Sequence, residues 1–142
     1  MRYFCCITAL LALAGLSLRA ADNADKFTSS TWYAGTGPRT QIWMLTVRGN
    51  SITGAVCGPC DDPRSLAPIV DGRVIDANHI TFFILHDLQG GLFAQYGPFR
   101  NEARVTISGD TADFNSHLEG EAWTSHPVHQ NWKLLSRKPS QK

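Results

Sequence analysis

The sequence predicts an all-β fold, an antiparallel meander of about eight short strands closed into a small barrel. Polar and apolar side chains alternate over short runs, as a half-buried strand requires, for example at residues 102–107. Tight-turn pairs such as Gly49-Asn50 and Gly109-Asp110 separate neighbouring runs. No ten-residue stretch shows a convincing helical period of 3.6 residues. A two-sheet β-sandwich is the alternative, but closure into a barrel is the simpler way to hide strand edges.

The chain of 142 residues has the length of one domain. Residues 1–20 are predicted to be a secretory signal peptide, because Arg2 precedes the apolar run Ile7–Leu18 and Ala20 offers a small residue for cleavage. We expect a disordered lead at 21–26, a single β-barrel domain at 27–138 and a tail at 139–142. The apolar run is shorter than the roughly 20 residues that a membrane span needs, so no membrane span is predicted.

An exported chain is secreted or periplasmic, and its charge argues against nucleic acid as a partner. Removal of Arg2 and Arg19 with the leader leaves eleven basic residues against twelve acidic ones. The basic residues are scattered singly, except near the tail at Lys133, Arg137 and Lys138, where a solvated chain end is the simpler explanation. Clustered Lys and Arg, the usual footprint of a nucleic-acid-binding protein, are otherwise missing from the sequence.

The first half of the barrel is organised around the predicted hairpin Gln41–Cys57. Trp43, Leu45 and Val47 fall on one face of its first strand, and Ile52, Gly54 and Val56 share one face of its second. A strand centred on Trp32 is expected before this hairpin, within Phe27–Ala34. After it, Ala67–Val70 and Gly72–Ile75 are expected to form one short strand, or a pair broken at Asp71-Gly72.

The second half begins with His79–His86, which is apolar on both faces. Such a strand needs a cover on both sides, and one candidate cover is a second copy of the chain, which would make the protein a homo-oligomer through this strand. Further strands are expected at Leu92–Tyr96, Arg100–Ile107, Thr111–Leu118 and Asn131–Arg137, with Trp123 opening another.

Several turn-and-strand motifs resemble a group of small secreted bacterial proteins of unassigned function. These motifs are Trp32, Gly49-Asn50-Ser51-Ile52-Thr53-Gly54, Asp71-Gly72-Arg73-Val74, Asn78-His79-Ile80-Thr81-Phe82 and Gly109-Asp110. The outline of that group is similar to the calycin barrels, the avidins and lipocalins, and the resemblance implies such a barrel here. Thr31-Trp32-Tyr33 followed by Ile52-Thr53-Gly54 also resembles the opening hairpin of avidin-type biotin binders, but their ligand-reading Asn is replaced by Ala34. The resemblance therefore implies a fold and not biotin binding.

Cys57 and Cys60 are the only cysteines after the leader, in the sequence Cys57-Gly58-Pro59-Cys60. A thioredoxin-like redox motif needs its first thiol at a helix N-terminus, whereas Asp61-Asp62-Pro63 follows here. In an exported protein we expect a local structural disulfide. Redox activity and metal binding are the alternatives.

The aromatic residues suggest two possible roles for the barrel interior. Eight-stranded barrels either fill the interior with side chains or hold one small ligand. The first hypothesis is a non-enzymatic binding module for a small apolar ligand. The second is a structural or protein-interaction barrel with a filled core. The candidate pocket-lining residues are Trp32, Trp43, Phe82, Phe114 and Trp132.

The sequence offers little to suggest an enzyme. The serines lie in no Gly-x-Ser-x-Gly motif, and no Gly-rich phosphate loop is present. Glu119 and Glu121 would share one side of a strand, which is more often a solvated face than an acid–base pair. His126 and His129 flank Pro127 and match a metal-binding spacing only loosely. We therefore predict no cofactor, no metal and no catalytic residue.

Overall fold

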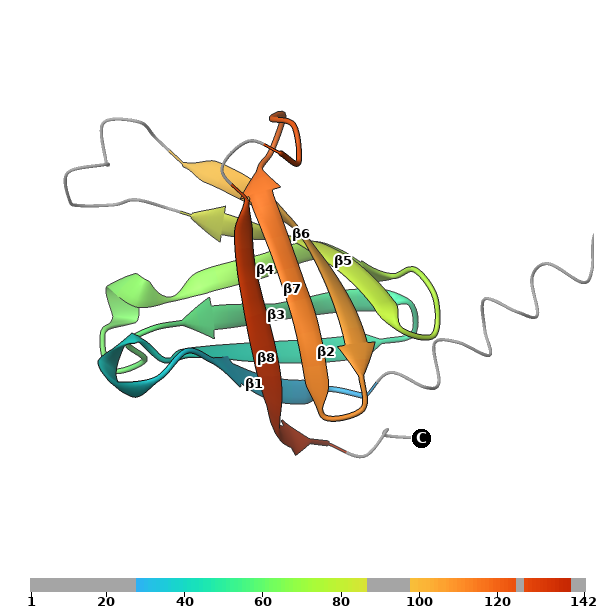
Figure 1. Cartoon of the computed structure of the whole chain (residues 1–142), viewed down its shortest axis with the longest axis horizontal. Coiled ribbons are helices and arrows are strands. Elements are labelled where there is room, and N and C mark those ends of the chain that lie inside the picture. The colour runs from blue at the N-terminus through green and yellow to red at the C-terminus, as the bar shows by residue number, and fades with distance from the viewer. Residues whose placement is uncertain (1–27, 87–97, 125–126, 139–142) are drawn as a thin grey trace, which may run out of the picture.

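The predicted barrel is present. The computed structural model describes residues 28–86, 98–124 and 127–138. Eight strands follow one another as an antiparallel meander, and β8 pairs back onto β1 to close the barrel (Figure 1). The strands are β1 (Ser30–Ala34), β2 (Gln41–Arg48), β3 (Ser51–Cys57), β4 (Ala67–Val74), β5 (His79–His86), β6 (Phe99–Ser108), β7 (Thr111–Leu118) and β8 (Val128–Arg137).

The connections divide the barrel into two ends. The short turns β2–β3, β4–β5 and β6–β7 lie at one end, together with the start of β1 and the end of β8; we call this the turn end. The ends of β1, β3, β5 and β7 and the starts of β2, β4, β6 and β8 lie at the other, the loop end (Figure 1). Two 3-10 turns, Gly37–Arg39 and Pro63–Ser65, belong to loop-end connections. Among the described residues, no helix has the length and apolar character needed to cross a membrane.

Alternating burial produces the core. Along β5, Ile80, Phe82 and Ile84 are buried while the residues between them are partly exposed. The same alternation gives a buried cluster with members from all eight strands. Each strand thus buries one face in a shared interior, which explains why period-2 patterning predicted the fold.

One strand prediction is resolved and another is wrong. Of the two arrangements expected around Asp71-Gly72, the single strand is present: it is β4, whose pairing with β5 shifts register between Val70 and Arg73. Asp71 takes a positive φ of 52°, so the turn-like dipeptide makes a bulge within the strand. Trp123 does not open a strand; it lies in a turn of the β7–β8 connection.

The signal peptide, the disordered lead, the tail and the strand expected at Leu92–Tyr96 lie outside the described residues. These parts of the prediction remain predictions.

Candidate functional site

The five candidate pocket-lining residues converge in the barrel interior, where they form what we call the aromatic cluster. Trp32, Trp43, Phe82, Phe114 and Trp132 are each at most 3% exposed. Ring centroids lie 4.5 Å apart for Trp43 and Trp132, and 4.7 Å apart for Trp43 and Phe114. Side chains that are almost completely buried leave hardly any room for a water molecule beside them. Protein atoms therefore fill the space around these rings.

The indole N–H groups of the cluster show how it is held. Trp32 Nε1 donates to Ser30 Oγ at 2.8 Å, and Trp132 Nε1 donates to Gln130 Oε1 at 3.2 Å. Gln130 in turn donates to Gln41 Oε1 at 2.7 Å, which ties β8 to β2 across the interior. Trp43 Nε1 is buried and has no hydrogen-bond partner among the described residues. Most polar atoms of the cluster are thus used within the fold.

A pocket of about 320 Å³ opens over the cluster at the turn end; we call it the turn-end pocket. Trp32 and Ser30 lie at its inner side, since both are buried inward-facing residues of β1. The rest of its lining comes from segments far apart in the sequence: the approach to β1, the β4–β5 and β6–β7 connections, and the end of β8. The lining residues are Thr28, Ser30, Trp32, Ala77, Asn78, Ile107, Gly109 and Arg137.

The polar side chains of this pocket can all donate a hydrogen bond, and Arg137 can only donate. Ser30 Oγ accepts from the Trp32 indole, so its own proton is free to point elsewhere. Arg137 donates to the Gly109 carbonyl, and its Nη1 lies 3.6 Å from Asp110 Oδ1. The Asn78 side chain forms no hydrogen bond with another described residue. No carboxylate belongs to the described lining.

Asp76 shapes the β4–β5 side of the pocket. Its carboxylate accepts from the backbone N–H of Asn78 at 2.9 Å and of His79 at 3.0 Å, and contacts His79 Nδ1 at 2.7 Å. The hydrogen bonds from Asn78 and then His79 hold the pKa of Asp76 below its ordinary value. The Asn78 carbonyl accepts from Ile107 N at 2.7 Å and joins this turn to β6. The two walls of the pocket are therefore connected.

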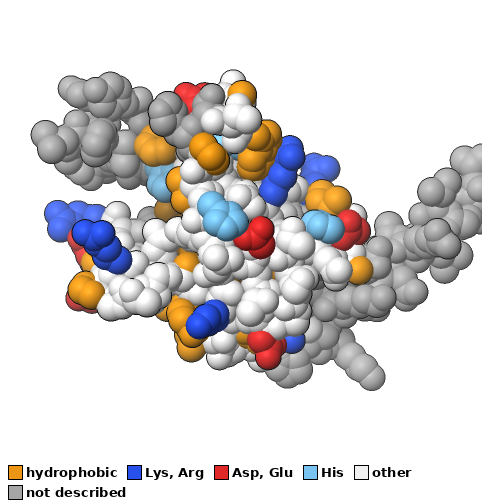
Figure 2. All heavy atoms as spheres, viewed as in Figure 1, with side chains coloured by type: hydrophobic (Ala, Val, Ile, Leu, Met, Phe, Trp, Pro, Cys, Tyr) orange, Lys and Arg blue, Asp and Glu red, His pale blue; other side chains and the backbone are white. Residues whose placement is uncertain are grey.

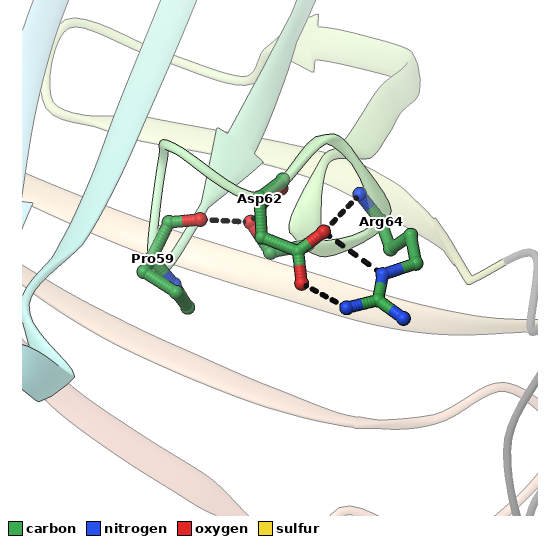
Figure 3. Close-up of polar contacts among 4 residues, drawn as sticks. Pro59, Asp62 and Arg64 are labelled. Carbon is green, nitrogen blue, oxygen red and sulfur yellow. Dashed lines mark hydrogen bonds and ion pairs between the residues drawn. The ribbon is translucent and has the colours of Figure 1, made fainter.

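The cysteines form the predicted disulfide. Cys57 and Cys60 are bonded with their Cα atoms 4.9 Å apart, at the start of the β3–β4 connection. Beyond it, the Asp62 carboxylate accepts from Arg64 N, Nε and Nη2 at 3.0 Å each (Figure 3). The Arg64 hydrogen bonds lower the pKa of Asp62. Ser65 also donates to the carbonyl groups of Pro59 and Asp62, so the loop is braced along its length.

The outer face of β5 is partly covered by the protein's own residues. The Arg100 guanidinium lies over the Phe83 ring, 4.5 Å from its centroid. Arg100 also contacts Glu119 Oε2 at 2.8 Å and Asp71 Oδ2 at 3.1 Å, which links β4, β6 and the end of β7 across this strand. The cover that His79–His86 was expected to need is therefore supplied in part within the chain.

A second cluster of polar groups lies on the outside of β6 and β7. Trp123 covers His117, with ring centroids 3.8 Å apart, and Arg104 lies 4.0 Å from the Trp123 ring centroid. His117 is 3% exposed, and its Nε2 is 3.3 Å from Glu102 Oε2. Trp123 thus packs against the outer surface of the barrel and does not enter its interior.

The face over β7 and β8 is mostly polar, with single charges of both signs (Figure 2). A shallow groove of about 430 Å³ runs along it, lined by Thr106, Ser108, Thr111, Ala112, Asp113, Asn131, Trp132 and Lys133. His129 Nε2 lies 3.3 Å from Asp113 Oδ1, and His129 Nδ1 lies 2.9 Å from Asn115 Oδ1. Within the part of the chain that the structure describes, no three His, Cys, Asp or Glu residues lie close enough together to hold a metal ion.

Sequence reasoning missed the residues that give the pocket its polar character: Ser30, Asn78 and Arg137. Asn78 was noted only as part of a turn motif, and Arg137 only as one of three basic residues near the tail. Comparison with known proteins adds no assignment, because no family model, curated protein or solved structure matches the chain.

Proposed function

We propose that the protein is an exported, non-enzymatic binding module that takes a small, partly apolar ligand in the turn-end pocket. In this proposal the aromatic cluster is the solid floor of the site, and the ligand binds above it. The carrying observation is the pocket of about 320 Å³ over Trp32, a volume at the lower end of the range for small-molecule sites.

The composition of the lining supports binding over catalysis. Ile107 and Ala77 provide apolar surface, while Ser30, Asn78 and Arg137 provide hydrogen-bonding groups. The accessible lining is more polar than apolar, which favours a ligand that carries a polar or charged group beside a smaller apolar part. The described lining holds no carboxylate, imidazole or thiol that could transfer a proton or attack a substrate.

The eight-stranded meander supports the resemblance to avidin- and lipocalin-like barrels, since up-and-down closure is the architecture of those proteins. The Cys57–Cys60 disulfide supports export, because disulfides persist in oxidising compartments. Secretion or residence in a periplasm is therefore part of the proposal.

A blocking substitution tests the site. Ala77→Trp should fill the pocket from its exposed rim and remove the thermal stabilisation that a library of small ligands gives the unchanged protein. Thr36→Trp, on an exposed residue of the β1–β2 connection, is the matched control at the loop end and should leave ligand binding unchanged. A ligand that stabilises both variants equally would place binding elsewhere and overturn the proposal.

The second candidate is a protein-interaction barrel with a filled core, favoured by the near-complete burial of all five cluster residues. In its oligomeric form, two copies would meet through β5. Phe83→Asp should then dissociate the oligomer in analytical ultracentrifugation, because a carboxylate replaces an apolar ring in the interface. The protomer should stay folded, because the new carboxylate lies beside Arg100 and can pair with it. Sedimentation of the unchanged protein as a monomer at all concentrations would contradict this form.

A further inference from the structure

We infer that the ligand of the turn-end pocket is a small organic acid, whose carboxylate binds at Arg137 and whose apolar part lies against Ile107. This inference rests on the proposed function and adds the chemical class of the ligand.

The charge of the pocket lining favours an anionic ligand. Arg137 is the only ionisable side chain in the described lining, and its side chain is 44% exposed, so the guanidinium is accessible from solvent. A guanidinium carries five N–H donors. The Gly109 carbonyl and the longer contact with Asp110 Oδ1 occupy two of its directions and leave further N–H groups for a ligand. An Arg fork with free donors fits the two oxygens of a carboxylate.

The neighbouring polar groups can donate hydrogen bonds to the ligand. The Ser30 oxygen already accepts from Trp32 Nε1, so this hydroxyl can offer its proton. The Asn78 amide and the Thr28 hydroxyl add two further donors at the lining. A neutral or anionic acceptor is thus better matched here than a cation, which would find no carboxylate in the described lining.

The inner side of the pocket can take the apolar part of the ligand. Trp32 is 1% exposed and closes the inner side of the pocket, whereas Ile107 is partly exposed and packs against the buried core, so Ile107 supplies the apolar contact there. A short aromatic or aliphatic chain would bury apolar surface there, while its carboxylate stays at the exposed rim beside Arg137. A volume of about 320 Å³ accommodates an acid such as 3-phenylpropionate.

Asp110 carries a negative charge beside Arg137, so substitutions at these two residues should change the affinity for an acid in opposite directions. Its carboxylate lies 3.6 Å from Arg137 Nη1, is 78% exposed and does not line the pocket. It competes with an incoming carboxylate for the same guanidinium. Removal of this charge should therefore strengthen acid binding, whereas removal of the Arg137 charge should weaken it.

The experiment is isothermal titration of the purified protein at low ionic strength with 3-phenylpropionate and its neutral isostere, 3-phenylpropanamide. We expect the acid to bind with a dissociation constant of about 0.1–1 mM and the amide at least about tenfold more weakly. Arg137→Gln should weaken acid binding about tenfold and leave amide binding unchanged, and Asp110→Asn should strengthen acid binding. Arg39→Gln, at the loop end, is the matched control and should change neither affinity.

A second arm distinguishes a free acid from a peptide C-terminus. The tripeptide Ala-Ala-Leu is titrated with a free and with an amidated C-terminus. Binding of the free form alone supports a terminal carboxylate as the natural group, whereas binding of 3-phenylpropionate without either peptide supports a free acid.

The outcomes separate this inference from the proposed function. Equal affinities for acid and amide, unchanged in Arg137→Gln, would overturn the inference and leave a neutral ligand site. Failure of both acid and amide to bind, while another ligand binds and is blocked by Ala77→Trp, would likewise refute only the carboxylate class. If no ligand of any class binds the turn-end pocket, both proposals fail.

Discussion

At the scale of single residues, Gly54 has the clearest steric requirement. It lies in β3 opposite Leu45 with a φ of 155°, and a Cβ built there would come within 1.8 Å of the Met44 carbonyl oxygen. That oxygen belongs to paired backbone and cannot retreat without breaking the β2–β3 ladder. We predict that Gly54→Ala lowers the free energy of unfolding by at least about 2–3 kcal/mol, measured by chemical denaturation.

Gly49→Ala provides the control for this prediction. Gly49 has a φ of 57°, but a Cβ there would meet nothing within 4 Å. Gly49→Ala should therefore lower the free energy of unfolding by only about 1–2 kcal/mol, the cost of placing a Cβ on a left-handed backbone. An equal fall in unfolding free energy for Gly49→Ala and Gly54→Ala would show that the contact of a Cβ at Gly54 with the Met44 carbonyl oxygen does not cause the destabilisation.

His86 makes the stability depend on pH. It is half-buried at the end of β5, stacks on Phe99 at 4.7 Å, and burial lowers its pKa below the ordinary value of 6.5. The neutral imidazole is therefore favoured in the folded state, so the unfolded chain binds the proton more readily. Its contribution to stability is fully present above pH 6.5 and is lost as the pH falls through the lowered pKa.

We predict that the unchanged protein loses more unfolding free energy between pH 7.5 and pH 5 than His86→Gln does. The other histidines are common to both proteins, so the difference between the two denaturation profiles isolates this one residue. Parallel profiles would show that His86 contributes nothing to the pH dependence.

At the scale of elements, the β3–β4 connection has two independent supports. The disulfide closes a ring of only four residues, and a ring this short restricts the unfolded chain little. The contacts of Asp62 with Arg64 and of Ser65 with Pro59 remain when the disulfide is removed (Figure 3). We predict that replacing Cys57 and Cys60 by Ser costs at most about 1–2 kcal/mol and leaves the barrel intact, as measured by circular dichroism and chemical denaturation.

Thiol titration of the unchanged protein checks the premise and should find no free thiol at Cys57 or Cys60. Insulin reduction that disappears in the double variant would contradict a purely structural role and favour the redox alternative.

The elements also show how far the sequence can be interpreted. The shared faces of Trp43 with Leu45 and of Phe82 with Ile80 followed from alternation, because a residue's face in a strand depends only on its local position, but alternation did not show which face of His79–His86 is inside. The bulge at Asp71 did not follow, since Asp-Gly is equally typical of a turn between strands. Trp123 was misassigned because its partners, His117 and Arg104, are brought to it only by pairing of β6 with β7.

The candidate site was less predictable than the fold for the same reason. Ser30, Asn78 and Arg137 belong to the start, middle and end of the barrel sequence and meet only when β8 closes onto β1. None belongs to a local motif with recognisable chemistry. The sequence could indicate an aromatic interior, but it could not indicate the pocket above it at the turn end.

At the scale of the whole molecule, the aromatic cluster fills the barrel interior around its rings. Phe82 is 0% exposed and its ring lies 6.3 to 6.5 Å from those of Trp43, Phe114 and Trp132. Removal of this ring should create a cavity inside the closed barrel that the unchanged protein lacks. An apolar cavity of this kind stays dry and accepts small apolar molecules.

We therefore predict that Phe82→Ala lowers the unfolding free energy by about 3–5 kcal/mol and that benzene or indole partly restores it. The same compounds should not stabilise the unchanged protein through its interior, so a ligand-dependent shift in thermal denaturation should be specific to the variant. Phe82→Leu, with a smaller cavity and a smaller loss, serves if the alanine variant does not fold. Benzene could instead stabilise Phe82→Ala and the unchanged protein equally, and still stabilise the protein when Ala77→Trp blocks the turn-end pocket. The native interior would then already admit a ligand, and the binding site would lie inside the barrel.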